Sequence, residues 1–275
     1  MVKITFVWHD CFVVQNGDVN LVFDYWLDAD GTFRQIPSAV ASLDRDIPLI
    51  VLVSHGHKDH FNRNIFGWAS EFRDVRYVVS TDVSKRIRHI VSPTSVYSGP
   101  KVDASRVVAL RHGNSFEYAG VKVTAFPSTD IGNSYLVETG RYRFFHAGDL
   151  NAWIWLEQST EAEVRKAMGD YRACLRDIDA YLHMLPESDR AIDFCFFPVD
   201  SRIGPKYWTG ASMFLRQFDV RRFFPMHFDL GDAVERLQRR TDALRFDLYA
   251  NPERGEYIPL AVHNSLFLTT CGMKC

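Results

Sequence analysis

The sequence predicts an α/β fold in which two mixed β-sheets form a sandwich with helices on both outer faces. Two observations predict this fold. Short β-branched and aromatic runs fill the first third of the chain and recur over residues 106–146. Each strand-rich half is followed by segments whose apolar residues have helical spacing. Because the chain has no repeat, low-complexity tract or linker, we expect residues 1–275 to form a single domain.

The first half contains five expected strands and two expected helices. The strands are Ile4–Val7, Phe12–Gln15, Val19–Phe23, Ile47–Val53 and Val75–Ser80. The turn Asn16-Gly17-Asp18 joins the second strand to the third as a hairpin. Apolar spacing predicts helices over Asn62–Phe72 and Asp82–Val91, and Pro93 ends the second of them.

The second half contains six expected strands and three expected helices. The strands are Arg106–Leu110, Val121–Phe126, Ser134–Glu138, Tyr142–His146, Ile192–Pro198 and Arg222–Pro225. The helices are Thr160–Leu185, Gly210–Phe218 and Asp232–Arg240. Thr160 and Glu163 form a capping box at the start of the longest helix. The apolar stripe of this helix indicates either packing against its own chain or a coiled-coil seam with a second subunit, which leaves a homo-oligomer open.

Composition and charge exclude several classes of protein. A hydrophobic content of 47% and a charged content of 24% are typical of soluble globular proteins. The formal net charge of −2 gives no basic footprint for nucleic acid or an anionic membrane, and no apolar stretch approaches membrane-spanning length. The five dispersed cysteines do not form a disulfide framework, so we expect a reducing, cytoplasmic location.

Residues 54–60, Ser-His-Gly-His-Lys-Asp-His, place four metal-type ligands directly after an apolar strand. The four are His55, His57, Asp59 and His60. Residues two apart in extended backbone project to the same side, so His55 and His57 are expected to face one point. Asp59 and His60 follow at the turn and can face a second. Imidazole and carboxylate suit a divalent ion such as zinc or iron.

Three other expected strands also end in residues of metal-ligand type. They are Asp24 after Leu21–Phe23, Asp149 after Tyr142–His146, and His227 after Arg222–Pro225. Together with the loop 55–60, these residues resemble the ordered motifs of the metallo-β-lactamase superfamily. The opening segments 7–12 and 23–25 are similar to those of its L-ascorbate-6-phosphate lactonase-like branch, with Trp8 in place of a glycine and Tyr25 in place of a proline. The resemblance implies a four-layer αββα sandwich of two mixed β-sheets.

The resemblance also implies roles for these residues around one or two divalent ions. His55 and His57 would hold the first ion, and Asp59, His60 and His227 the second. Asp149 would bridge the two ions, and Asp24 would orient the histidine loop from behind the ligands. Zinc is the expected metal, with manganese and iron as alternatives.

One ligand of the family pattern is missing from the loop 127–134, which contains no histidine. Asp130 is the best substitute there, because a carboxylate is a legitimate ligand. His112 is the rival, although it precedes a Gly113-Asn114 turn and reads as a surface residue. A third alternative is that the first site is empty and only one metal binds.

The implied activity is that of a metal-dependent hydrolase, which uses a metal-activated hydroxide on a small ester, lactone or phosphodiester. Asp59 would both bind metal and orient the nucleophile. His9 is the candidate proton donor to the leaving group, by its position in the branch pattern. A structural hydrogen bond would explain His9 equally well.

Substrate contacts are expected from loops that follow the strands of the second half. Trp153 and Trp155 would wall the pocket, or else pack in the core. Arg202 and Lys206 would bind an anionic group on a small-molecule substrate, with a surface ion pair between Arg202 and Asp200 as the alternative.

Other functions of the same fold fit the sequence less well. A di-iron redox protein would carry Glu at the position of His57, and an RNA-processing nuclease would carry a basic surface. From a different class, a non-catalytic metal-binding or scaffold protein with a degraded first metal site remains an alternative, supported by the missing histidine.

Overall fold

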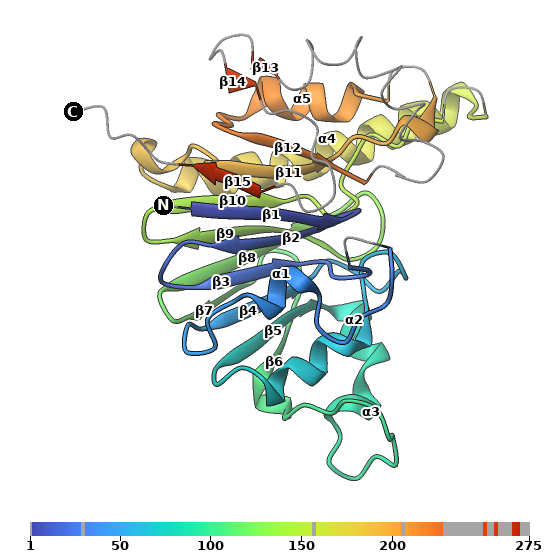
Figure 1. Cartoon of the computed structure of the whole chain (residues 1–275). Coiled ribbons are helices and arrows are strands. Elements are labelled where there is room, and N and C mark those ends of the chain that lie inside the picture. The colour runs from blue at the N-terminus through green and yellow to red at the C-terminus, as the bar shows by residue number, and fades with distance from the viewer. Residues whose placement is uncertain are drawn as a thin grey trace. The chain divides into compact units, whose positions relative to one another are not determined.

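The computed structural model describes residues 2–28, 31–155, 158–204 and 207–227, with strand segments at 250–251, 256–257 and 266–269. The chain forms two compact units (Figure 1). The first comprises residues 1–111, 116–121 and 261–275, and the second residues 112–115 and 122–260. The predicted helix Asp232–Arg240 lies outside the described residues.

The first unit is built on a seven-stranded mixed sheet with the order β15-β1-β2-β3-β4-β5-β6. Its strands are β1 Val2–Trp8, β2 Cys11–Gln15, β3 Asn20–Phe23, β4 Leu49–Val53, β5 Val75–Ser80, β6 Val107–Leu110 and β15 Leu266–Thr269. The pairs from β15 to β3 are antiparallel, and those from β3 to β6 are parallel. The interior strand β4 is buried along its whole length, as parallel strands covered on both faces usually are.

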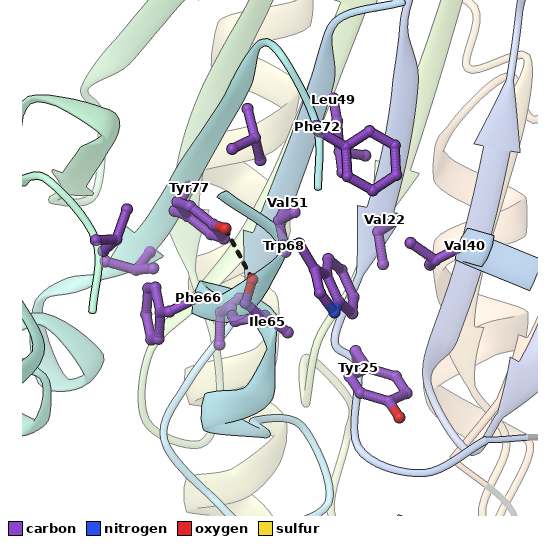
Figure 2. Packing of buried hydrophobic residues seen from close by; sticks show 14 of the residues in the cluster. Val22, Tyr25, Val40, Leu49, Val51, Ile65, Phe66, Trp68, Phe72 and Tyr77 are labelled. Atoms are coloured by element: carbon purple, nitrogen blue, oxygen red, sulfur yellow. Dashed lines mark hydrogen bonds between the residues drawn. The ribbon is translucent and has the colours of Figure 1, made fainter. Parts of the chain in front are cut away.

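Short helices cover one face of this sheet. They are α1 Ser38–Ala41, the 3₁₀ helix η1 Arg63–Ser70, α2 Thr81–Arg86, α3 Arg88–Val91 and the 3₁₀ helix η2 Ala104–Arg106. The apolar residues of α1, η1, α2 and α3 form one core with side chains from the strands. Figure 2 shows Trp68 of η1 beside Tyr25 in that core, and their ring centroids are 5.4 Å apart. This packing holds the loops that follow β3 and β4 against a rigid support.

Tyr77 of β5 donates a buried hydrogen bond of 2.7 Å to the carbonyl of Ile65, drawn as a dashed line in Figure 2. Tyr77→Phe should lower the free energy of unfolding by about 1–2 kcal/mol, because the carbonyl of Ile65 loses its partner while remaining buried. Urea denaturation followed by circular dichroism measures this change. Tyr142→Phe is the control, since no hydrogen bond to its hydroxyl is found among the described residues, and equal losses in the two variants would contradict the prediction.

The second unit contains most of a six-stranded mixed sheet with the order β12-β11-β10-β9-β8-β7, of which residues 116–121, in β7 and at the start of β8, belong to the first unit. Its strands are β7 Ser115–Tyr118, β8 Val121–Pro127, β9 Asn133–Thr139, β10 Tyr142–His146, β11 Phe194–Pro198 and β12 Phe223–Met226. Its helices are α4 Glu161–Met184, α5 Thr209–Gln217 and the 3₁₀ helices η3 Glu187–Asp189 and η4 Ser201–Ile203. Strands β10, β11 and β12 are parallel, so the segments after β10, β11 and β12 leave the same edge of the sheet. A separate two-stranded sheet pairs β13 Ala250–Asn251 with β14 Glu256–Tyr257.

The long helix α4 begins at the predicted capping box, in which Thr160 and Glu163 bond reciprocally. Its apolar stripe packs within its own unit. Tyr171 donates a 2.7 Å hydrogen bond to the carbonyl of Gly210, and Tyr181 lies edge-on to Phe126 of β8. The intrachain explanation of the stripe is therefore correct for the C-terminal half of α4.

Two predicted helices differ from the structure, and one strand was missed. The segment expected as the helix Asn62–Phe72 is the 3₁₀ helix η1, and the expected helix Asp82–Val91 is interrupted at Ile87. Strand β7 was not predicted, because its residues alternate between exposed and half-buried and make no apolar run. None of the helices among the described residues combines the length and apolarity that crossing a bilayer requires.

Candidate metal centre

Strand pairing in the first unit places Asp24 behind the histidine loop. The backbone N–H of Asp24 donates to the carbonyl of Leu52, which continues the parallel pairing of β3 with β4. Its carboxylate then accepts hydrogen bonds from the backbone N–H and the hydroxyl of Ser54, at 2.7 and 2.5 Å. The same carboxylate lies 2.9 Å from Nδ1 of His60. Asp24 therefore fixes both the start of the loop and the ring of His60.

The first two histidines of the loop come together. His55 is buried, and its Nε2 lies 2.9 Å from Nδ1 of the exposed His57. The hydroxyl of Ser54 lies 3.0 Å from Nδ1 of His55. His55 and His57 thus present ring nitrogens at one point, as their spacing predicts.

The backbone between these histidines is held by α2. The N–H of Gly56 donates to Asp82 at 2.8 Å, and the carbonyl of Gly56 accepts from Arg86 at 2.6 Å. A Cβ at position 56 would lie 2.7 Å from Nε of Arg86, so a larger residue there would have to displace the Arg86 side chain. The loop is therefore fixed from both of its sides.

Four ligand-type side chains of the first unit converge around His60. The His60 cluster consists of His9, Asp10, Asp59 and His60. Nε2 of His60 lies 3.2 Å from Asp10 and 4.0 Å from Asp59, and Nε2 of His9 lies 3.6 Å and 3.5 Å from the same two carboxylates. His9, Asp10 and His60 are buried, whereas Asp59 is one-third exposed.

The charges in the His60 cluster favour an ionised Asp59. Burial alone raises the pKa of the Asp59 carboxyl. The hydrogen bond to His9 and the charges of His60 and His9 outweigh burial, so the pKa lies well below its ordinary value. Asp59 is therefore a carboxylate at neutral pH and can bind a cation or accept hydrogen bonds.

A second group of ligand-type residues lies at the edge where β10, β11 and β12 end. The Asp149 cluster consists of Asp149, Asp200 and His227. Nε2 of His227 lies 3.3 Å from Asp149, and Nδ1 of His227 lies 3.1 Å from Asp200. All three side chains are buried. The ring of His227 is thus held between two carboxylates, one at each nitrogen.

Asp200 is ionised in this arrangement. Burial raises the pKa of its carboxyl, but the hydrogen bonds to His227 and Arg202 and their positive charges outweigh burial and lower the pKa to about 2. Arg202 donates to Asp200 through Nε at 2.9 Å and through Nη2 at 2.6 Å, and its side chain is 51% exposed. Arg202 is therefore placed beside His227 with half of its surface open to solvent.

Of the two tryptophans predicted to line a pocket, Trp153 lies beside the Asp149 cluster. Trp153 donates a 2.8 Å hydrogen bond to the carbonyl of Asp149, and its ring lies edge-on to His227 at 5.3 Å. Trp155 is 36% exposed. Lys206, predicted to bind an anionic group, lies outside the described residues.

Asp130 and His112, the two residues that could replace the missing histidine ligand, are both exposed. Asp130 presents a carboxylate oxygen within 4.8 Å of a carboxylate oxygen of Asp149. Nε2 of His112 lies 2.9 Å from the carbonyl of Gly132, in the same loop. The structure therefore brings Asp130 near a predicted ligand within the second unit.

Sequence reasoning missed Asp10 and the orienting role of Asp200. Asp200 carries the same signal as Asp149, because it follows the end of a strand in a parallel part of the sheet. Asp10 is adjacent to His9 in a two-residue turn, but only the pairing of Trp8 with Cys11 shows how tight the turn is. Both residues also gain their roles from partners distant in sequence.

The His60 cluster fits a divalent metal ion by the chemistry of its donors, and the Asp149 cluster offers one imidazole nitrogen and one carboxylate of the same kind. Imidazole nitrogens and carboxylate oxygens are the donor set of zinc, iron and manganese sites in proteins. In each cluster a carboxylate holds the Nδ1 side of a histidine, and Nε2 of that histidine lies beside another carboxylate. This is the carboxylate–histidine arrangement that orients metal-binding imidazoles.

Comparison with known proteins agrees with this geometry. A model of the β-lactamase superfamily domain matches residues 19–228. The chain belongs to the β-lactamase superfamily. A superfamily relative, a UPF0173 metal-dependent hydrolase of Desulforamulus reducens, is 30% identical over 240 residues, which cover 82% of this chain and 84% of the relative. The chain is thus placed among the metal-dependent hydrolases of the superfamily.

Solved structures confirm the predicted metallo-β-lactamase fold. The metallo-β-lactamase fold protein YhfI of Bacillus subtilis matches with a TM-score of 0.56 and 9% identity, over 97% of this chain and 98% of YhfI. The di-iron β-hydroxylase CmlA of Streptomyces venezuelae matches with a TM-score of 0.58 and 14% identity, over 97% of this chain and 54% of CmlA. At such low identities the similarity establishes the fold alone. The likeness to the ascorbate-6-phosphate lactonase-like branch stays a prediction.

Proposed function

We propose that this superfamily member hydrolyses a small ester, lactone or phosphodiester with the help of one or two divalent ions. The proposed metal ligands come from the loop 55–60, from the Asp149 cluster and from its neighbour Asp130. They are His55, His57, Asp59, His60, Asp130, Asp149 and His227. Zinc is the first candidate metal, with manganese and iron as alternatives.

The supporting observation is an arrangement shared by His60 and His227, in which one carboxylate lies at Nδ1 and another faces Nε2. Asp24 accepts the Nδ1 proton of His60, so Nε2 of that ring carries either a lone pair or a second proton. Nε2 faces the carboxylates of Asp10 and Asp59, and a lone pair there would be repelled by their oxygens. Nε2 of His227 faces Asp149 in the same way while Nδ1 bonds to Asp200. A bound cation removes the repulsion at both histidines and leaves each imidazole neutral.

The side chains themselves would orient and stabilise the reactants. A divalent ion, when bound, lowers the pKa of a coordinated water and polarises a carbonyl or phosphoryl oxygen. Asp59 is held ionised and partly exposed, so it can accept a hydrogen bond from the attacking water and orient it. Asp24 and Asp200 keep the rings of His60 and His227 in fixed orientations. Trp153 restricts the space beside His227.

A substrate screen tests this function. Protein purified without chelator would be assayed on phosphodiester, lactone and thioester panels with added zinc, manganese or iron(II). We expect hydrolysis of at least one class that depends on the metal and is lost with a chelator. Activity that survives complete metal removal would contradict the proposal.

One observation favours the non-catalytic alternative. Two of the proposed ligands, His57 and Asp130, are exposed to solvent. An ion that both residues coordinate would therefore be bound less tightly. A scaffold protein with a degraded site would retain the fold but bind almost no metal. Metal content therefore separates this alternative from the enzyme.

Arg202 provides a test of the charge of the substrate. We expect Arg202→Ala to raise KM for an anionic substrate about tenfold, because a half-exposed guanidinium beside His227 is placed to bind an anionic group. kcat should change less than KM. Steady-state kinetics on anionic and neutral substrates of the same class measure the effect, with the exposed Arg172→Ala as the control. Equal KM values for Arg202→Ala and the wild type would show that Arg202 does not bind the substrate.

A further inference from the structure

The turn between β1 and β2 consists of only His9 and Asp10, because Trp8 pairs directly with Cys11. His9 has a left-handed backbone with φ of +54°. Two-residue turns of this kind normally contain Gly, Asn or Asp at such positions, and a bulky residue is unfavourable there. Both side chains are nonetheless buried, at 5% and 0% exposure. The turn therefore holds an imidazole and a carboxylate in a strained, enclosed position.

Their polar atoms meet those of the loop 55–60. Asp10 lies 3.2 Å from Nε2 of His60, and Nε2 of His9 lies 3.5 Å from Asp59. Asp10 and His9 are themselves 3.6 Å apart. Ligand atoms bound at about 2.0–2.2 Å to one ion are separated from each other by roughly 3–3.6 Å. Three of the four distances between these imidazole nitrogens and carboxylates fall within or at the edge of that range, and the fourth, from Nε2 of His60 to Asp59, is 4.0 Å.

We propose that His9 and Asp10 are metal ligands that join Asp59 and His60 in binding one divalent ion. This inference rests on the proposed function, in which Asp59 and His60 already bind metal. It assigns a ligand role to Asp10 and gives His9 a ligand role in place of proton donation. An imidazole that binds metal through Nε2 has no proton to deliver from that atom.

The ligand set has a consequence for metal choice. Two imidazoles with two carboxylates offer more oxygen than a site dominated by histidine, and oxygen-rich sites suit manganese(II) and iron(II) better. Burial also favours a bound cation: the carboxyl groups of Asp10 and Asp24 are buried on either side of His60, and buried carboxylates are normally paired with a cation or a metal. We therefore expect the first unit to bind manganese(II) as well as zinc.

Metal titration of four proteins tests the inference: the wild type, Asp10→Asn, His9→Gln and the control Asp28→Asn. Asp28 is a buried carboxylate of the same unit that bonds to Arg34 and Ser38 instead of the cluster. Manganese(II) affinity would be measured by electron paramagnetic resonance of the free ion, and zinc affinity by competition with a chromophoric chelator. We expect Asp10→Asn and His9→Gln to weaken manganese binding at least tenfold and zinc binding less, with Asp28→Asn unchanged.

The outcomes separate this inference from the proposed function. A wild type that binds no metal refutes the proposed function itself. A wild type that binds metal, with Asp10→Asn and His9→Gln binding equally well, refutes only the ligand roles of His9 and Asp10. If either variant fails to fold, anomalous diffraction from wild-type crystals loaded with manganese decides. A manganese peak about 2.2 Å from Asp10 and His9 supports the inference. A manganese peak within bonding distance of His60 but beyond bonding distance of Asp10 and His9 overturns it.

Discussion

His60→Gln is expected to remove at least one bound metal equivalent and to lower kcat/KM roughly a thousandfold or more, equivalent to about 4 kcal/mol of transition-state stabilisation. His60 is fully buried, and Asp24 fixes its ring so that Nε2 faces Asp10 and Asp59. Glutamine has neither a rigid ring nor a nitrogen lone pair at that point, so it cannot replace the ligand.

Inductively coupled plasma mass spectrometry and steady-state kinetics measure the two effects of His60→Gln. The control is His89→Gln, which removes a half-buried histidine of the same unit that packs on Tyr97. Circular dichroism and thermal unfolding would show that both variants are folded. Full metal content and full activity in His60→Gln would show that His60 is not a metal ligand.

Asp149→Asn is expected to lower kcat at least a hundredfold, a larger effect than that of Asp130→Asn. The Asp149 carboxylate is buried and lies 3.3 Å from Nε2 of His227, and the resemblance to the superfamily implies that it bridges two ions. An amide carries no charge and presents only one oxygen, so it binds a cation more weakly. Asp130 is exposed and would be, at most, one ligand of the first ion.

The pair of carboxylate variants also tests the replacement for the missing histidine. Metal content and kcat would be measured side by side for Asp149→Asn and Asp130→Asn. A moderate loss in Asp130→Asn with weaker binding of one equivalent would support its ligand role. No change in Asp130→Asn would favour a centre with a single metal. Wild-type kcat in Asp149→Asn would contradict its place among the ligands.

Much of the fold was predictable because the strands carry strong local signals. Val51 and its neighbours in β4 form a continuous apolar run, which indicates a buried strand. Thr160 and Glu163 mark the start of α4 by the local hydrogen bonds of a capping box. The 3₁₀ form of η1 was not predictable, since the apolar spacing over Ile65, Phe66 and Ala69 fits either helix type in so short a segment.

The site was predictable as a set of residue types but not as a geometry. The density of His and Asp in the loop 55–60 is visible in the sequence, and so is the order of Asp24, Asp149 and His227. The ring orientation of His60 depends on Asp24, 36 residues away, and that pairing follows from the register of β3 with β4. Asp10 reaches His60 only because the β1–β2 turn is so short. Contacts of this kind are made by tertiary structure, which no local pattern encodes.

Metal analysis of the wild-type protein is the most direct test of a metal-dependent hydrolase. The protein would be purified without chelator, its transition metals quantified per chain, and the measurement repeated after chelation and reloading with zinc, manganese or iron(II). One or two equivalents that are removed by the chelator and restored by reloading are expected. A protein that carries almost no metal, and takes up none of the three ions when they are supplied, would contradict the central claim.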